Sequence, residues 1–301
     1  MTTHEIQPLA ETLIYELTKA LALPQTGRAR RWVRLIFGKA ARAAAEVGIG
    51  LDRAVASGGL SGGARWVLPR FVRSHEARGV ENIPGAGALV IASNHPANVD
   101  SLVISAHVNR PDYKVIIGDI PFFEHLPHVS EHAIYAPNAT DTVGRMQVVR
   151  QATRHLKSGG ALLIFPRGGI EPDPDFMPNP DGEFHQWSRS LEVFLNRVPG
   201  LQILITITSG VISRSAFHHP ITWFRRQRPD KQRLAFLYQL ARQFITGRES
   251  FGLTPRVTFG KTVAGHAHEH MLAEIEQAAR RTLQNHLAWG NSGPACNLTL
   301  A

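Results

Sequence analysis

The chain of 301 residues is poor in cysteine and lacks long apolar runs. Its single cysteine, Cys296, cannot form a disulfide within the chain, which favours a reducing, cytoplasmic compartment. The N-terminus has no basic segment followed by an apolar one, so we expect no signal peptide. No stretch of about 18 uninterrupted apolar residues occurs, so we expect no transmembrane segment and only peripheral contact with a membrane.

Acidic residues are scarce relative to basic ones. The chain has 33 Lys and Arg against 24 Asp and Glu, a formal net charge of +9. This excess suits an anionic partner such as nucleic acid, a membrane surface, an acyl carrier protein or a phosphorylated substrate. We find no recognised nucleic-acid-binding module and therefore expect no nucleic acid.

Helical patterns come first in the chain, and strand patterns follow. Apolar residues recur at helical spacing over 5–22 and 28–56, and a Gly/Ser cluster at 57–63 breaks the second pattern. We find no strand pattern before residue 80. Compact apolar runs predict buried strands at 86–94, 113–119, 132–136, 161–166, 201–208 and 256–260. Helical patterns occupy 101–109, 142–158, 185–197 and 267–288.

This alternation of strands and helices predicts an α/β fold with a mixed, largely parallel sheet flanked by helices. We place the α/β domain, with its C-terminal helix, at residues 78–301. A helical N-terminal region of residues 1–77 precedes it.

Two basic segments of the sequence also contain aromatic residues. The helix predicted at 28–56 combines six Arg and Lys residues in its first half with Trp32, Ile36 and Phe37. Such a helix can lie on an anionic membrane, or it can pack on the α/β domain with a solvated basic face. The run "WFRRQRPDKQR" at 223–233 could contact lipid headgroups, phosphates of coenzyme A or acyl carrier protein.

The stretch "IASNHPANVDSLVI" at 91–104 carries the first candidate for chemistry. His95 falls at the carboxyl end of a predicted strand, where ligands gather in α/β sheets, and Asp100 lies near the start of the next helix. A histidine there can act as a general base if a carboxylate holds its ring in one tautomer. Alternatively, Asn94 or Asp100 simply caps the helix.

"NHPANVD" also resembles the N-H-x4-D block of the glycerolipid acyltransferases, the lysophosphatidic acid and glycerol-3-phosphate acyltransferases. The lead-in "RGVENIPGAGALVIASN" is similar to that family's entry into the block. "LLIFPRGGIEPD" at 162–173 falls where the family carries its F-P-E-G-T-R block. The resemblance covers residues 78–265.

The resemblance implies an O-acyltransferase. His95, oriented by Asp100, would take the proton of an acceptor hydroxyl, and the oxygen would attack the thioester of acyl-CoA or acyl carrier protein. Backbone N–H groups near the turn would stabilise the oxyanion. The acceptor would be a lipid or glycerol phosphate. We expect no cofactor and no metal, and we place Asn94 among the substrate-binding residues.

The second block departs from the family pattern. Arg167 replaces the family's glutamate, and Ile170 replaces the arginine that binds the acceptor phosphate in the family. Gly168 and Gly169 would let the backbone approach an anion, and Arg167 would supply the charge. Alternatively, the glycines only form a turn, and Arg167 pairs with Glu171 or Asp173 in the same block.

Two further positions follow from the family's middle block, which ends in an arginine. Asn138 stands near that place, and Arg145 is the nearest arginine downstream. Arg145 would contact an anionic substrate, or else it is a solvated residue at a helix start. The departures at Ile170 and Asn138 also motivate an alternative: a non-catalytic lipid- or acyl-carrier-binding protein on the same fold, or an acyltransferase with a non-phosphorylated acceptor.

Overall fold

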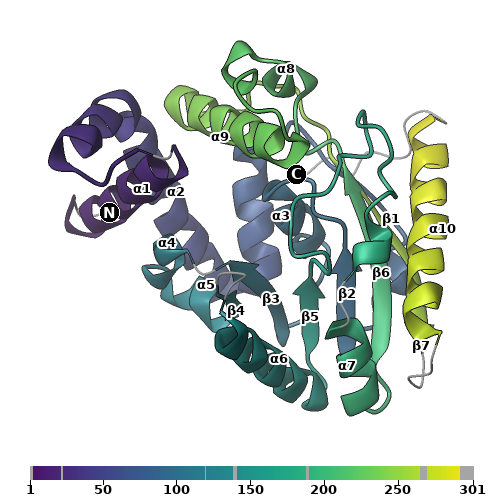
Figure 1. The fold of residues 1–301 in the computed structure, drawn as a ribbon. Coiled ribbons are helices and arrows are strands. Elements are labelled where there is room, and N and C mark those ends of the chain that lie inside the picture. The colour runs from purple at the N-terminus through teal and green to yellow at the C-terminus, as the bar shows by residue number, and fades with distance from the viewer. Residues whose placement is uncertain are drawn as a thin grey trace.

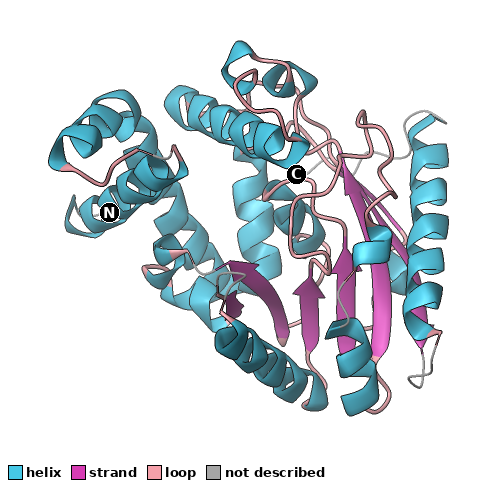
Figure 2. Ribbon diagram, in the orientation of Figure 1, coloured by secondary structure: helices cyan, strands magenta, loops and turns pink. Residues whose placement is uncertain are grey.

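The computed structural model describes residues 3–21, 23–118, 120–137, 141–187, 190–264 and 270–291, so Cys296 lies outside the described residues. Within these ranges the chain forms one seven-stranded sheet with helices on both faces (Figure 1). Figure 2 shows the strands gathered at the centre and the N-terminal helices to one side. The predicted fold class, a mixed and largely parallel sheet flanked by helices, is confirmed.

The strand order across the sheet is β1-β7-β6-β2-β5-β3-β4. The strands are β1 (Glu76–Arg78), β2 (Leu89–Ser93), β3 (Tyr113–Gly118), β4 (Ala133–Ala136), β5 (Ala161–Ile164), β6 (Gln202–Ser209) and β7 (Arg256–Ala264). The five strands from β6 to β4 run parallel, whereas β6 and β7 pair antiparallel. β1 pairs parallel to β7 at the other edge. It is too short to produce a sequence pattern, and the expectation of no strand before residue 80 was wrong.

The described helices agree with the predicted segments in several places and add others. They are α1 (Thr3–Ala20), α2 (Gly27–Val67), α3 (Val99–Ser105), α4 (Pro121–Glu124), α5 (Pro127–Glu131), α6 (Thr142–Lys157), α7 (Ser190–Arg197), α8 (Arg214–Phe217), α9 (Arg228–Thr246) and α10 (Met271–Asn291). Short 3-10 turns are η1 (Leu68–Arg70), η2 (Val80–Asn82), η3 (Phe184–Gln186) and η4 (Pro220–Thr222). In the part of the chain that the structure describes, none of these helices combines the length and apolar character needed to cross a bilayer.

The sheet separates two apolar cores, because side chains alternate across a strand. In β2, Leu89 and Ile91 face a core shared with α2, α3 and α9. Val90 and Ala92 face the opposite core, which contains residues of α6, α7 and α10. All four side chains are fully buried. β2 is also the middle strand of the seven, so the residues that follow it are anchored at the centre of the sheet.

The Gly/Ser cluster at 57–63 interrupts α2, as the sequence predicted. Gly59 has φ 61° and ψ −172°, a non-helical conformation that glycine tolerates, so two helical segments meet there at a kink. Thr26 caps its start by accepting the Ala29 N–H at 3.4 Å. Beyond the bend, Ala64 and Val67 belong to the core under the sheet. The division of the chain at residue 78 stays a prediction.

α9 is the largest element that the sequence pattern did not indicate. Its buried side includes Gln232, Gln239 and Gln243, each 2% exposed or less. Gln239 accepts the Ser213 N–H at 3.0 Å, and Gln243 donates to the Phe71 carbonyl oxygen at 2.8 Å. α9 also places Ala235 and Phe236 in the core under the sheet, so its buried side mixes apolar residues with glutamines that bond to loop backbone.

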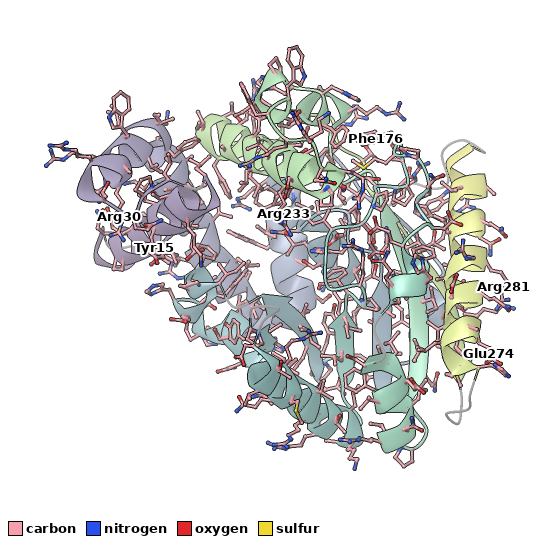
Figure 3. All side chains as sticks on the ribbon, viewed as in Figure 1. Tyr15, Arg30, Phe176, Arg233, Glu274 and Arg281 are labelled. Carbon is pink, nitrogen blue, oxygen red and sulfur yellow. The ribbon has the colours of Figure 1, made fainter. Side chains whose placement is uncertain are left out.

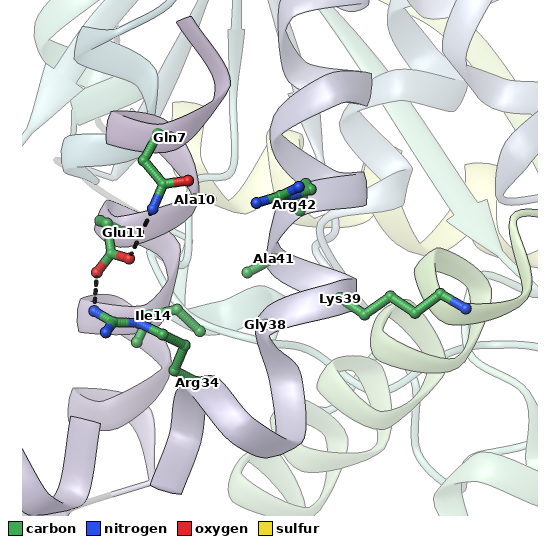
Figure 4. A pocket seen from close by; sticks show the side chains of 9 residues that line it. All are labelled: Gln7, Ala10, Glu11, Ile14, Arg34, Gly38, Lys39, Ala41 and Arg42. Atoms are coloured by element: carbon green, nitrogen blue, oxygen red, sulfur yellow. Dashed lines mark hydrogen bonds and ion pairs between the residues drawn. The ribbon is translucent and has the colours of Figure 1, made fainter. Parts of the chain in front are cut away.

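α1 and α2 pack against each other at the N-terminal side and enclose a shallow hollow of about 400 Å³ (Figure 4). Ile14 and Ala41 lie at its base in a small apolar cluster. Gln7, Glu11 and Arg34 form a hydrogen-bonded chain along its rim, with an Arg34–Glu11 ion pair of 2.5 Å. None of the residues predicted for catalysis lines this hollow.

Candidate active site

The carboxyl ends of β2, β5 and β6 meet at one edge of the sheet. β2 lies between the other two, and all three run parallel. The N-H-x4-D turn follows β2, and the F-P-R-G-G loop follows β5. Figure 1 shows α8 and α9 beyond this same edge. Since open α/β sheets bind ligands beyond the carboxyl ends of their strands, both sequence blocks stand where a site is expected.

His95 and Asp100 form the contact that the sequence predicted. His95 Nδ1 lies 2.9 Å from Asp100 Oδ2. Asp100 is fully buried and also accepts the backbone N–H groups of Ala97 and Ser101, at 3.1 and 2.6 Å. The carboxylate therefore orients the imidazole and also stabilises the first turn of α3. This hydrogen bond favours a proton on Nδ1 and leaves Nε2 as the acceptor.

The surroundings of His95 raise its pKa above the ordinary value. Burial lowers the pKa, but the charge and hydrogen bond of Asp100 and the charge of Glu171 outweigh it. The imidazole stacks on the Phe165 ring, with 4.2 Å between centroids. The His95 side chain keeps 20% of its surface exposed, so one side of the ring is open to a substrate.

Glu171 holds the main chain of His95, a role that the sequence did not indicate. The Glu171 N–H donates to the His95 carbonyl oxygen at 2.8 Å, and Glu171 Oε2 accepts the His95 N–H at 3.0 Å. Glu171 Oε1 accepts the indole N–H of Trp187 at 3.0 Å. Burial raises the pKa of Glu171 to about 7. The second block thus positions the first through paired backbone contacts.

Arg167 lies in an ion network with residues outside its own block. It forms an ion pair with Glu183, which also binds Arg228 at 2.5 Å. Both guanidinium groups donate to the Ile170 carbonyl oxygen, at 3.4 and 3.2 Å. The acid beside Arg167 is therefore Glu183 and not, as the alternative expected, Glu171. The predicted contact of Arg167 with a substrate stays a prediction.

The glycine pair forms the turn that leaves β5. Gly168 has φ 69°, and its N–H donates to the Phe165 carbonyl oxygen at 2.9 Å. A Cβ atom on Gly169 would lie only 2.3 Å from Arg167 Nη1, so glycine there lets the guanidinium fold back over the turn. Ile170 is buried and apolar. A phosphate contact of Gly168 and Gly169 stays a prediction.

Asn94 and Asp173 fasten the two blocks to the end of β6. Asn94 Nδ2 donates to the Thr208 carbonyl oxygen at 2.9 Å, and the Thr208 N–H donates to Asn94 Oδ1 at 2.8 Å. The buried Asp173 carboxylate accepts the N–H groups of Gly210 and Val211 at 2.8 and 3.0 Å. The Asn94 amide is 1% exposed, and its predicted contact with a substrate stays a prediction.

The structure does not bring Arg145 to His95. Arg145 is an exposed residue in the first turn of α6, which follows β4 at the edge of the sheet. β4 is three strands away from β2. Asn138 lies outside the described residues. Among the residues that the structure does describe, no three His, Cys, Asp or Glu side chains gather as metal ligands would.

α9 packs against the site and contributes Gln232, a residue that the sequence analysis did not identify. Gln232 Nε2 donates to the carbonyl oxygens of Pro96 and Glu171, at 3.1 and 2.8 Å. One amide therefore bridges the turn after β2 and the loop after β5. The sequence analysis noted only the basic run at 223–233, which contains Gln232.

The fold and this geometry define an α/β protein with a carboxylate-oriented histidine suited to deprotonating a hydroxyl. Residues 74–194 match the family model described as Acyltransferase, and this segment contains both sequence blocks. This match bears out the resemblance to the acyltransferase family over this segment and supports an O-acyltransferase.

Two further comparisons concern solved structures and curated proteins. The chain is similar to the crystal structure of the 1-acyl-sn-glycerophosphate (LPA) acyltransferase PlsC from Thermotoga maritima, with 14% sequence identity and a TM-score of 0.46. That alignment covers 97% of this chain and 99% of the other. No curated protein matches the chain significantly in sequence.

Proposed function

We propose that the protein moves a fatty acyl group from a thioester to a hydroxyl of a glycerolipid-type acceptor, as a step of phospholipid biosynthesis. The acceptor resembles glycerol 3-phosphate or lysophosphatidic acid, and the donor is acyl-CoA or acyl carrier protein. The observation that carries the proposal is the 2.9 Å contact between His95 Nδ1 and the buried Asp100 carboxylate, which leaves Nε2 as the ring nitrogen that can accept a proton.

The reaction consists of one addition and one elimination. His95 Nε2 accepts the proton of the acceptor hydroxyl, and the oxygen forms a bond to the thioester carbon. The tetrahedral intermediate collapses, the carbon–sulfur bond breaks, and the thiolate takes the proton from His95. Asp100 stabilises the imidazolium between these steps, as its effect on the His95 pKa indicates. No covalent enzyme intermediate, metal or cofactor takes part in this sequence.

Contact with a membrane is part of the proposal, because a lipid acceptor resides there. On α2, the side chains of Trp32, Leu35 and Ile36 are 66%, 79% and 59% exposed. Exposed basic residues surround them, namely Arg28, Arg31, Arg34, Lys39 and Arg42. Apolar side chains that insert between lipids, flanked by cations that bind anionic headgroups, are typical of peripheral membrane helices.

A second surface of this kind precedes α9. Trp223 and Phe224 are 69% and 88% exposed, and the exposed Arg225 and Arg226 follow them. Co-sedimentation with vesicles containing phosphatidylglycerol tests both surfaces. We expect Leu35→Ser with Ile36→Ser to weaken binding by more than tenfold, because about 0.8 kcal/mol is lost per CH2 withdrawn from the bilayer and each change removes several carbons. Met146→Ser on α6 is a control of similar exposure, and equal binding by all variants would contradict the contact.

The alternative is a non-catalytic protein that binds lipid or acyl carrier protein on the same fold. The observation that favours it is the second block: Ile170 is buried, and Arg167 is paired with Glu183. This alternative predicts ligand binding without thiol release, and binding that is indifferent to the change His95→Ala.

A screen of donors and acceptors with the purified protein, following release of free thiol, separates the two functions. We expect thiol release with at least one acceptor hydroxyl and its loss in His95→Ala, while the circular dichroism spectrum stays unchanged. Full activity of His95→Ala with any acceptor would exclude His95 as the base. Absence of thiol release from the unaltered protein with every donor would favour the non-catalytic alternative.

A further inference from the structure

We infer that Arg233, at the start of α9, binds a phosphate group of the substrate beside His95 and so takes the part of the arginine that Ile170 replaces. The inference rests on the proposed acyl transfer and names the chemical class of its substrate. The shared chemistry is a phosphate, which either the acceptor or coenzyme A can present.

The position of Arg233 follows from its neighbour in α9. Gln232 is fully buried and bonded to the carbonyl oxygens of Pro96 and Glu171, so this turn of α9 is fixed on both sequence blocks. Arg233 is the next residue, and its side chain is 61% exposed. Figure 3 shows Arg233 in the space between α9 and the carboxyl ends of the central strands. Arg233 is therefore exposed and lies one residue from the side chain that contacts both sequence blocks.

The charge of Arg233 acts on the histidine. Arg233 is one of the groups that lower the pKa of His95, against the larger raising effects of Asp100 and Glu171. The same positive charge would attract an anionic group of a substrate whose hydroxyl sits on Nε2. A bound phosphate would neutralise this charge, so substrate binding itself would make His95 a stronger base.

The other arginines near the two blocks are already engaged. Arg167 and Arg228 share the Glu183 carboxylate and the Ile170 carbonyl oxygen. Arg233 has a loose ion pair with Asp230, 3.6 Å long and exposed on both sides, which a phosphate can displace. Of these three guanidinium groups, Arg233 is therefore the one best disposed to bind a phosphate bidentately.

The test compares Arg233→Gln with Arg242→Gln. Both variants lose one positive charge. Arg242 is an exposed arginine nine residues further along α9 and therefore lies on the opposite side of the helix. With a phosphorylated acceptor such as sn-glycerol 3-phosphate and acyl-CoA, we expect Arg233→Gln to raise one KM about tenfold. We expect kcat to change little and Arg233→Lys to recover part of the loss.

The substrate whose KM rises identifies the source of the phosphate. A rise confined to the acceptor assigns the site to the acceptor phosphate, and a rise confined to acyl-CoA assigns it to coenzyme A. An acyl carrier protein donor in place of acyl-CoA separates the two further. The inference is overturned if neither KM changes, or if Arg242→Gln has the same effect as Arg233→Gln.

Direct binding keeps this inference separate from the proposed function. If the protein releases no thiol with any donor, calorimetric titration with sn-glycerol 3-phosphate and with coenzyme A still tests the phosphate site. Binding of either ligand that is lost in Arg233→Gln and kept in Arg242→Gln supports the site. Equal binding by both variants, or no binding by the unaltered protein, overturns it.

Discussion

The turn after β2 and the loop after β5 lie side by side, yet they differ in how far they keep the family pattern. The first retains N-H-x4-D and forms the His95–Asp100 contact. The second has lost its glutamate and arginine, and its remaining basic residue, Arg167, is tied to Glu183. The contact that orients His95 is thus present where the second block lacks the basic residues of the family pattern, and we propose that α9 supplies the phosphate contact instead.

Changing the first region has the largest expected effect. His95→Ala removes the proton acceptor, and general acid–base catalysis typically contributes about 10²–10⁴-fold, so kcat should fall about 10³-fold. The rate of thiol release measures this loss, and unfolding by urea checks that the fold is kept. A loss below about tenfold with an intact fold would place the base elsewhere.

Weakening the contact between the two regions has an intermediate expected effect on kcat. Glu171→Gln keeps the shape of the side chain, but its amide has only one acceptor oxygen and can accept only one of the N–H groups of His95 and Trp187. We expect kcat to fall about tenfold, the equivalent of one weakened hydrogen bond. Trp187→Phe, which frees only the far oxygen of Glu171, should have a smaller effect on kcat.

The same variant has a predictable dependence of stability on pH. Burial raises the pKa of Glu171 from 4.5 to about 7, so between these values the folded protein binds a proton that the unfolded chain releases. The unfolding free energy of the unaltered protein should therefore fall relative to that of Glu171→Gln as pH rises through this window. Urea unfolding at both ends of the window measures the difference, and parallel curves for the two proteins would contradict the burial of an ionisable Glu171.

Changing the second region alone has the smallest expected effect. Arg167→Ala breaks an ion pair whose two side chains are 21% and 19% exposed, so we expect a loss of about 1–2 kcal/mol in stability. The KM for the acceptor should change by less than about threefold, because Arg167 is bound to Glu183 before substrate arrives. A larger rise in KM than that caused by Arg233→Gln would return acceptor recognition to the second block.

The sequence was sufficient for features that depend on near neighbours. The apolar runs predicted the parallel strands, because a strand buried on both faces leaves a compact apolar pattern. The five-residue spacing of His95 and Asp100 allowed their contact, because a tight turn followed by a helix can bring such residues together, and the resemblance of the whole block to the acyltransferases favoured it.

The sequence was insufficient where contacts span long distances or where buried residues are polar. The partners Glu183 and Arg228 lie 16 and 61 residues after Arg167, and no local pattern links them. α9 was not among the predicted helices, although Ala235 and Phe236 belong to the core, and the contacts of its buried glutamines with loop backbone have no signature in the sequence. Polar contacts of this kind join the elements around the site, and sequence periodicity does not reveal them.

The pH dependence of kcat/KM, measured for the unaltered protein and for Asp100→Asn, tests the central claim most directly. We predict that kcat/KM of the unaltered protein rises with pH and levels off above an apparent pKa higher than about 6.5, because His95 must be neutral to accept a proton and its pKa is raised. In Asp100→Asn the apparent pKa should fall and the plateau should drop about 100-fold, since the raising charge and the orientation are both lost. A profile that is flat with pH, or one that is identical in the two proteins, would contradict His95 as the base oriented by Asp100.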